Sequence, residues 1–410
     1  MKIPALALLC LACAASVTAQ DAPKNADAAL RRKTFEKVWK TVNEKFYDPD
    51  FNGADWKAAR ARYAPQAEAA RTDEEFYAVL GRMLSELKVS HMEVIPAAAL
   101  AQSDSPPVTT GLGLSDVEGR VTVVRVLPGS AAERAGVRPG FVLVRVDGEE
   151  VKTLGEAADL LDGEPGTKAR VTLLDAADAP REFELERSAP RPGEVERTTR
   201  GKYTAYARFE ARRLEGGVGY VRFSAFIPAL DRRIAEAVSS MHDAPGLVID
   251  LRGNGGGEDS VAVKLAGLLF DKPTQLMVTR KRGGEDFYYK ARPAKRPYLG
   301  PVAVLVDGRS GSASEQLTAG LQEAGRAYVV GNVTAGDDMD AELEELPNGD
   351  YLVYAAGLPH TPKGAVVEGR GVRPDLEVNL TRAGLLRGED AQLEAALRYI
   401  RTQKTPKGNH

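Results

Sequence analysis

Apolar residues recur at helical spacing in the N-terminal part of the chain. Between Phe35 and Val42 they fall at positions i, i+3, i+4 and i+7, which is one stripe along a helix. A second stripe of this kind runs from Phe76 to Leu87. We therefore predict a helical segment over residues 28–105, ending in a small, proline-containing linker over residues 97–107.

The pattern changes twice further along the chain. Residues 106–190 carry short β-branched runs between glycine and proline turns, which predicts a small β domain. After a charged, proline-containing linker over residues 189–203, apolar strands alternate with amphipathic helices through residues 203–386. This alternation indicates an α/β domain with a mostly parallel, buried sheet. Residues 387–410 are expected to form a closing helix and a tail.

The first twenty residues are typical of a targeting signal. Lys2 precedes an apolar run over residues 3–15, and Val17 and Ala19 place small residues before a cleavage site. A membrane-spanning helix needs about 20 apolar residues, so this run is too short to predict a span. We expect residues 1–20 to be a cleaved signal peptide and the mature chain to be secreted or periplasmic.

Both cysteines of the chain, Cys10 and Cys13, lie in this signal segment. Cys13 raises lipid attachment as an alternative, but the residues before it fit such a signal poorly. The mature chain would contain no cysteine, so disulfides would not stabilise it.

Composition excludes several function classes. The formal net charge is −3, which argues against a protein that binds nucleic acid by neutralising phosphates. Two cysteines and four histidines offer no zinc-type spacing. We therefore expect no metal or cofactor, no nucleic-acid partner, and no stable membrane span once the signal is cleaved.

Three motifs follow one another in the β domain. A Gly-Leu-Gly-Leu stretch over residues 111–114 precedes a strand, and Pro-Gly-Ser-Ala-Ala and Val-Asp-Gly follow at residues 128–132 and 146–148. Their order and spacing resemble those of a PDZ domain, although Phe141 stands where such domains usually carry an acidic residue. The resemblance implies that one loop holds the carboxylate of a peptide C-terminus, and that the peptide adds as a strand beside it. The loop residues are Gly111, Leu112, Gly113 and Leu114. The alternative is a β domain whose groove has lost this function.

A glycine cluster follows an apolar strand in the α/β domain, in the stretch Asp-Leu-Arg-Gly-Asn-Gly-Gly-Gly over residues 250–257. Glycines let backbone N–H groups approach a ligand, and such a nest suits an anion or a developing oxyanion. The cluster lacks the Gly-Lys-Ser/Thr ending of a nucleotide-binding loop. A tight turn without a ligand is the alternative interpretation.

A serine-rich loop follows another apolar strand and opens a helix, over residues 307–315. A serine at a strand–turn–helix junction lies in the positive field of the helix N-terminus, where a nucleophile would be placed. Serine is also common in turns and helix caps. Composition alone does not choose among Ser310, Ser312 and Ser314.

The order of these segments resembles the carboxyl-terminal processing and tricorn-type serine peptidases of family S41. The resemblance covers most of residues 30–380, including a terminal Glu-Gly-Arg-Gly-Val-Arg-Pro-Asp over residues 368–375. It implies that Ser312 is the nucleophile. It also implies an oxyanion hole formed by the N–H of Ala313 and that of a glycine in the cluster, Gly256.

One departure from the family bears on the mechanism. The processing branch uses a lysine in a Thr-x-Gly-Lys segment, whereas this chain has Asp337 at that position. The tricorn-like branch uses a Ser-His pair, which matches Ser90 and His91, and a neutral imidazole is a suitable base near neutral pH. In that branch a glutamate and a second serine complete a catalytic tetrad, and Glu368 matches this glutamate.

We therefore expect a serine endopeptidase that cleaves peptide bonds through an acyl-enzyme on Ser312, with peptide substrates recognised through their C-termini. His360 is the next candidate base, and His242 is expected in a turn. The alternative is a catalytically silent peptide-binding protein of the same fold. On that alternative, Asp337 marks the loss of the Ser–Lys dyad that the processing branch uses.

Overall fold

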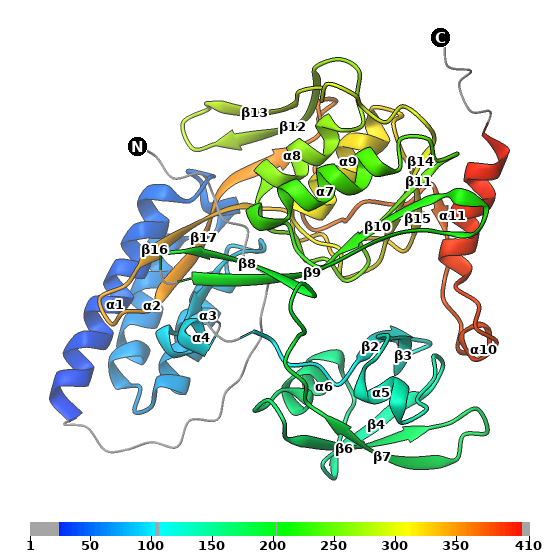
Figure 1. The fold of residues 1–410 in the computed structure, drawn as a ribbon. Coiled ribbons are helices and arrows are strands. Elements are labelled where there is room, and N and C mark those ends of the chain that lie inside the picture. The colour runs from blue at the N-terminus through cyan, green and yellow to red at the C-terminus, as the bar shows by residue number, and fades with distance from the viewer. Residues whose placement is uncertain (1–23, 103–105, 202, 404–410) are drawn as a thin grey trace.

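Three helices pack together in the N-terminal part of the computed structural model, which describes residues 24–102, 106–201 and 203–403 (Figure 1). The predicted signal peptide lies outside the described residues. Both predicted apolar stripes pack into one core, the first from α1 and the second from α3 and the turn that follows it, as far as Leu87. The Thr72 side chain accepts the N–H of Glu75 and caps the start of α3. The helices are α1 (Lys24–Lys45), the short η1 (Phe51–Gly53), α2 (Trp56–Ala69) and α3 (Asp73–Ser85).

The β domain is a separate sheet with the order β2-β3-β4-β6-β7, and β5 pairs with β4. In this sheet β2 lies at an edge, beside the helix α6. Thr153 and Glu156 form a capping box that starts α6. The elements are β2 (Leu112–Val117), β3 (Arg120–Val126), α5 (Ala131–Arg134), β4 (Val142–Val146), β5 (Glu149–Glu150), α6 (Leu154–Leu161), β6 (Lys168–Leu174) and β7 (Pro180–Glu186).

A seven-stranded sheet forms the centre of the α/β domain, with the order β18-β15-β14-β11-β10-β9-β8. Its strands from β18 to β10 run parallel, and β9 and β8 are antiparallel additions. The mostly parallel sheet is thus confirmed. The strands are β8 (Val195–Arg200), β9 (Tyr203–Arg213), β10 (Gly219–Phe223), β11 (Leu247–Asp250), β14 (Val302–Val306), β15 (Tyr328–Gly331) and β18 (Leu376–Glu377).

Helices cover both faces of this sheet, as a buried parallel sheet requires. One face packs against α7, α8 and α9, and the other against α11. Alternate residues of β11 show the division, because Ile249 lies in the first core and Val248 in the second. The helices are η2 (Glu215–Gly217), η3 (Pro228–Leu230), α7 (Asp231–Ser240), α8 (Asp259–Gly267), α9 (Ala313–Glu323), α10 (Arg382–Leu386) and α11 (Ala391–Thr402).

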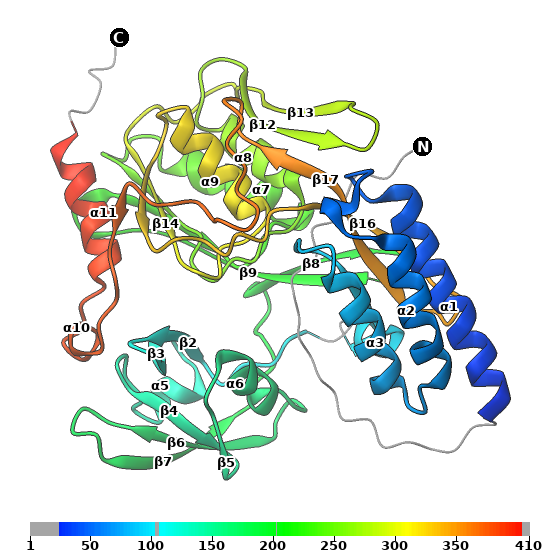
Figure 2. The same cartoon turned by 180° about the vertical axis from the view of Figure 1, so that it is seen from behind.

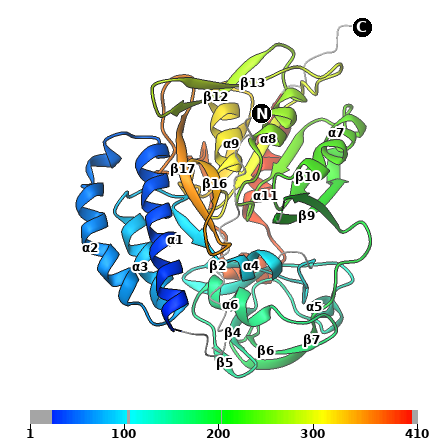
Figure 3. The same cartoon turned by 90° about the vertical axis from the view of Figure 1, so that its left-hand side faces the viewer.

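A second sheet joins the N-terminal helices to the α/β domain, with the order β1-β17-β12-β13 and β16 beside β17 (Figure 3). Residues of β16 and β17 share a core with α1, α2 and α3, because the apolar stripes of the helices need a partner surface. Residues 340–360 therefore serve two parts of the molecule. The strands are β1 (Glu93–Ile95), β12 (Thr274–Lys281), β13 (Asp286–Ala291), β16 (Asp340–Glu345) and β17 (Tyr351–His360).

The two predicted linkers contain regular structure. Residues 97–102 form the short helix α4 (Ala97–Gln102), and residues 195–200 form β8, which pairs along its length with β9. Neither segment has an apolar period that would predict it. Strand β8 depends on backbone pairing at a sheet edge, and such pairing leaves no local pattern in the sequence. Within the described residues, no helix is long and apolar enough to cross a membrane.

Candidate active site

Ser312 lies in the turn between β14 and α9, as predicted from the strand–turn–helix pattern. Its backbone has φ 50° and ψ −121°, a strained conformation for a residue with a side chain. The residue is 2% exposed, and its Oγ has no hydrogen-bond partner among the described residues. The hydroxyl is thus held in place by its backbone and left free of bonds.

The two neighbouring serines make structural hydrogen bonds instead. Ser310 Oγ donates to the carbonyl of Leu251, and Ser314 Oγ donates to the carbonyl of Asn254, both at 2.8 Å. These two bonds fix the serine loop to the glycine loop. Of the three candidate serines, Ser312 is the one with an unengaged hydroxyl.

The glycine cluster packs directly against Ser312. A Cβ on Gly256 would lie 2.7 Å from Ser312 Cβ and 2.9 Å from the carbonyl oxygen of Gly311, and Gly256 has φ 107°. A residue with a side chain would therefore clash at this position. The N–H of Gly256 donates to Asn254 Oδ1 at 2.9 Å. The N–H of Ala313 is the first of α9 and has no acceptor within the helix.

Glu368, Ser90 and His91 form a chain of hydrogen bonds. Ser90 Oγ lies 2.9 Å from Glu368 Oε2 and 2.7 Å from His91 Nδ1. The backbone N–H of Ser90 also donates to Glu368 Oε1, at 2.6 Å. The structure thus brings together three of the residues that the sequence singles out.

This chain of bonds assigns the proton on the imidazole. An ionised carboxylate accepts hydrogen bonds only, so the single hydroxyl proton of Ser90 goes to Glu368. Ser90 Oγ then accepts a proton from Nδ1 of His91. The Nε2 atom of His91 is left with its lone pair, which is the tautomer that a general base requires.

His91 is buried at 7% exposure and has φ 57°, so it shares a left-handed backbone with Ser312. Burial lowers the pKa of His91 to about 4. The imidazole is therefore neutral at pH 7.

Asp337 and Asp338 connect Ser312 to the hydrogen-bonded chain that Glu368 begins. The carbonyl of Asp337 accepts the N–H of Ser312 at 2.9 Å, and the N–H of the next residue, Asp338, donates to Glu368 Oε2 at 2.7 Å. Ser312 and Glu368 are therefore bonded to the two sides of a single peptide group, the one between Asp337 and Asp338. Since Ser312 Oγ has no partner, no hydrogen bond joins it to His91 in this state.

Glu315 is a site residue that the sequence analysis missed. Its carboxylate accepts the N–H groups of Ser312, Gly336 and Asp337 at 3.1, 2.8 and 3.0 Å, and it also accepts the Thr334 hydroxyl. Burial raises the pKa of Glu315 to about 7, whereas these bonds favour the ionised form. The Ser-x-x-Glu spacing of a capping box was the signal that could have identified it.

The other histidine candidates lie elsewhere. His360 Nδ1 is 2.9 Å from the carbonyl of Thr361, and exposed His242 has Nε2 at 3.2 Å from the carbonyl of Pro297. Neither residue is bonded to Ser90, Ser312 or Glu368 in the described part of the chain. Of these three histidines, His91 is the one that is hydrogen-bonded to Ser90.

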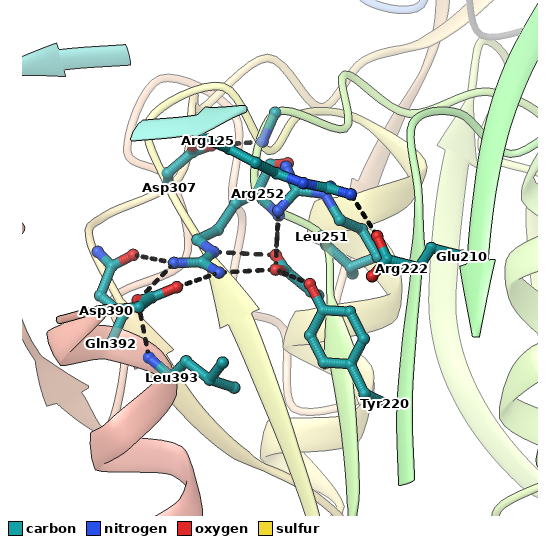
Figure 4. A network of polar contacts seen from close by, with 12 residues as sticks. Arg125, Glu210, Tyr220, Arg222, Leu251, Arg252, Asp307, Asp390, Gln392 and Leu393 are labelled. Carbon is teal, nitrogen blue, oxygen red and sulfur yellow. Dashed lines mark hydrogen bonds and ion pairs between the residues drawn. The ribbon is translucent and has the colours of Figure 1, made fainter. Parts of the chain in front are cut away.

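Buried charges anchor the glycine loop to the C-terminal helix (Figure 4). Although burial alone would raise the pKa of Asp250, the guanidinium groups of Arg222 and Arg252 hold it well below its usual range. Arg252 also pairs with Asp390, at the start of α11, at 2.9 Å. Because the residues of the loop follow Arg252 directly, this network fixes where the loop begins.

The predicted peptide-binding loop lies at the start of β2. Gly111 has φ 92°, and a Cβ there would lie 2.0 Å from Ser130 Oγ. Leu112 and Leu114 are partly buried against the domain core. Among the described strands β2 pairs with β3 alone, so its other edge is open for a peptide strand.

Three family models match this chain. Residues 217–378 match peptidase family S41, residues 27–85 match the tricorn protease C1 domain, and residues 122–175 match a PDZ domain. The matches fall on the α/β domain, the N-terminal helices and the β domain respectively. The predicted order of parts is thereby confirmed.

Two curated relatives align over most of the chain. A chloroplastic C-terminal processing peptidase of Tetradesmus obliquus is 30% identical over 359 residues, which cover 84% of this chain and 76% of the relative. A carboxyl-terminal-processing protease of Synechocystis is 28% identical over 383 residues, which cover 89% of this chain and 86% of the relative.

Solved structures share the fold. The photosystem II D1 C-terminal processing protease superposes with a TM-score of 0.59 at 26% identity, covering 88% of this chain and 98% of that one. The tricorn protease superposes with a TM-score of 0.54 at 16% identity, covering 91% of this chain and 37% of that one, which supports the fold alone. This chain belongs to peptidase family S41, the family of the carboxyl-terminal processing serine proteases, and carries a PDZ domain.

Proposed function

We propose that this protein is a secreted or periplasmic serine endopeptidase that uses Ser312 as nucleophile and His91 as general base. The observation that carries the proposal is the Glu368–Ser90–His91 chain of hydrogen bonds, which leaves Nε2 of His91 unprotonated. The base takes the place of the lysine that Asp337 replaces. The leader over residues 1–20 supports export from the cytoplasm.

In the first step, Ser312 Oγ attacks a peptide carbonyl carbon while Nε2 of His91 takes the hydroxyl proton. The C–N bond then breaks, and His91 returns the proton to the leaving amine. Water hydrolyses the resulting ester with His91 again as base, which releases the acid and restores Ser312. Each turn consumes one water and leaves the enzyme unchanged.

The oxyanion formed in each step needs donors beside Ser312. The N–H of Ala313 lies at the start of α9 without an acceptor in the helix. Gly256 supplies the second donor, and its N–H must be shared between Asn254 and the oxyanion. Glu368 and Ser90 are positioning residues that orient the imidazole.

The PDZ domain recognises substrate C-termini in this proposal. The loop of Gly111 to Leu114 offers backbone N–H groups to a carboxylate, and the open edge of β2 accepts the peptide as a further strand. The partners are thus proteins or peptides with accessible C-terminal ends.

Labelling by a fluorophosphonate probe tests the mechanism. We expect the mature protein to be labelled, and labelling to be lost in Ser312→Ala and to fall about 10²–10⁴-fold in His91→Ala. His242→Ala, on the surface, is the matched control and should label like the unchanged protein.

The alternative, a catalytically silent peptide-binding protein, has one observation in its favour, because Ser312 Oγ makes no hydrogen bond to His91. An unlabelled protein whose PDZ domain still binds C-terminal peptides would support that alternative and exclude the peptidase mechanism.

A further inference from the structure

One strand of the second sheet has an open edge. Strand β13 ends the order β1-β17-β12-β13, so among the described strands it pairs with β12 alone. It lies at the top of the molecule in Figure 1 and Figure 2, on the side away from the PDZ domain. An edge strand presents unpaired N–H and C=O groups, which can pair with a further strand.

Two aromatic side chains of β13 are exposed. Phe287 and Tyr288 are 53% and 59% exposed, which is more than the other large apolar side chains that the structure describes. Tyr289, between them and the end of the strand, packs instead against the core of the α/β domain. Aromatic side chains exposed at the edge of a sheet indicate a surface that meets another protein chain.

The β12–β13 hairpin is held in place at its turn. Arg282, in that turn, donates to the carbonyls of Phe46 and Asn43 at 2.8 and 3.3 Å. These two carbonyls lie in the last turn of α1 and just after it. The edge is therefore presented in a fixed position, so little ordering is needed before another strand can bind.

The hydrogen bonds of the hairpin show which peptide groups of β13 face the open edge. The N–H of Lys281 donates to the carbonyl of Glu285 at 3.2 Å, next to the turn. Because hydrogen-bonded pairs alternate along an antiparallel ladder, Phe287 is the next residue of β13 that bonds to β12. The peptide groups of Asp286 and Tyr288 therefore point towards the open edge.

The side chains that alternate with Phe287 and Tyr289 carry opposite charges. Asp286, Tyr288 and Lys290 share one face of β13, and all three are exposed. Arg280 Nε lies 3.9 Å from Asp286 Oδ1, which leaves this carboxylate able to accept a second cation. One end of the strand is thus acidic and the other basic, with an aromatic ring between them.

We propose that β13 pairs with β13 of a second copy of this chain, in antiparallel orientation about a two-fold axis at Tyr288. In this register the two Tyr288 residues exchange backbone hydrogen bonds, and each Asp286 lies opposite Lys290 of the second copy. Centring the pair on Asp286 or on Lys290 would place like charges opposite each other, which is destabilising. This complementarity of the strand to itself assigns the edge to a second copy and not to a substrate peptide. The two five-stranded sheets then join into one continuous sheet.

Sedimentation velocity over a series of protein concentrations tests this interface. We expect the unchanged protein to dimerise, and the dissociation constant to rise about ten-fold or more in Asp286→Lys and in Lys290→Asp. Each variant places two pairs of like charges in the interface. An equimolar mixture of the two variants should dimerise within about three-fold of the unchanged protein, because every pair across the mixed interface is then opposite in charge.

Glu184→Lys is the matched control, because Glu184 is exposed on β7, the edge strand of the PDZ sheet, and this variant should dimerise normally. Recovery in the mixture shows that the single variants are folded. An unchanged protein that stays monomeric at every concentration would overturn the inference. The inference also fails if both charge variants dimerise like the unchanged protein, or if their mixture stays as weak as its components. Labelling by the fluorophosphonate is a separate measurement, so the proposed function stands or falls independently of this interface.

Discussion

At the scale of single residues, the two groups assigned to proton transfer share an unusual backbone. His91 and Ser312 have φ values of 57° and 50°, a region that residues with side chains seldom adopt. Each is held there by its surroundings, His91 by the bond to Ser90 and Ser312 by the bonds of its N–H to Asp337 and Glu315. Strain that is retained in this way is typical of reactive sites.

The pH dependence of labelling follows from the burial of His91. Because burial lowers its pKa from 6.5 to about 4, the base stays neutral through the mildly acidic range. We expect the fluorophosphonate labelling rate to stay level down to about pH 5 and to fall only as the pH drops through about 4. An inflection near pH 6.5 would contradict a buried imidazole.

The same shift affects stability. Between pH 6.5 and 4 the unfolded chain binds a proton at this position that the folded chain does not. The contribution of His91 to stability is therefore complete above pH 6.5 and declines as the pH falls towards 4. Unfolding midpoints measured at each pH would separate this loss of stability from loss of the base.

At the scale of elements, the sequence pattern predicted the helices and strands whose buried residues recur at a regular spacing along the chain. The helix expected to open at the serine-rich loop is α9, and the apolar strand expected before the glycine cluster is β11. The packing of β16 and β17 on the N-terminal helices was not predicted, because it joins residues about 300 positions apart. Pairing at that distance depends on the whole fold and not on local spacing.

At the site, the sequence predicted the side chains but not the backbone contacts that hold them. Ser90, His91 and Glu368 were assigned by resemblance to the family, and the structure brings them into one chain of bonds. The N–H of Asp338 also bonds to Glu368, but a backbone donor has no side chain that could reveal it in a sequence. The free hydroxyl of Ser312 could be identified only once the bonds of its neighbouring serines were known.

The contact between the glycine loop and α9 predicts a strong effect of Gly256→Ala. The added Cβ would lie 2.7 Å from Ser312 Cβ, so either the loop or the nucleophile must move. Since the proposed oxyanion donors, Gly256 and Ala313, lie in these two elements, we expect fluorophosphonate labelling to slow about 10²-fold.

Gly349→Ala is the control for backbone strain. Gly349 has φ 87°, and nothing lies within 4 Å of a Cβ there. This change should cost about 1–2 kcal/mol of unfolding free energy and leave labelling unaltered. If Gly256→Ala labelled at the rate of the unchanged protein, the loop would not pack against Ser312 in solution.

At the scale of the whole molecule, the PDZ domain lies beneath the α/β domain, near the segment that carries α10 (Figure 2). Two ion pairs join the PDZ domain to the rest of the chain. Arg125 on β3 pairs with Glu210 on β9, and Arg382 on α10 pairs with Asp178 at 2.9 Å. The short helix α10 also places Leu386 against the PDZ core. Since α10 follows β18 of the central sheet, the PDZ domain docks on a segment that comes directly after that sheet.

This docking predicts that Arg382→Ala loosens the PDZ domain without unfolding it. Arg382 donates to the carbonyl of Gly140 at 2.9 Å as well as pairing with Asp178, and a hydrogen bond from a charged group contributes about 1.5–3 kcal/mol. We expect amide exchange in α10 and in residues 138–142 to quicken about ten-fold or more, because opening of the interface becomes easier. Arg387→Ala is the matched control, since Arg387 pairs only with Glu389 of its own segment among the described residues. Equal exchange in the two variants would mean that α10 does not hold the PDZ domain, and that the PDZ domain moves independently of the catalytic sheet.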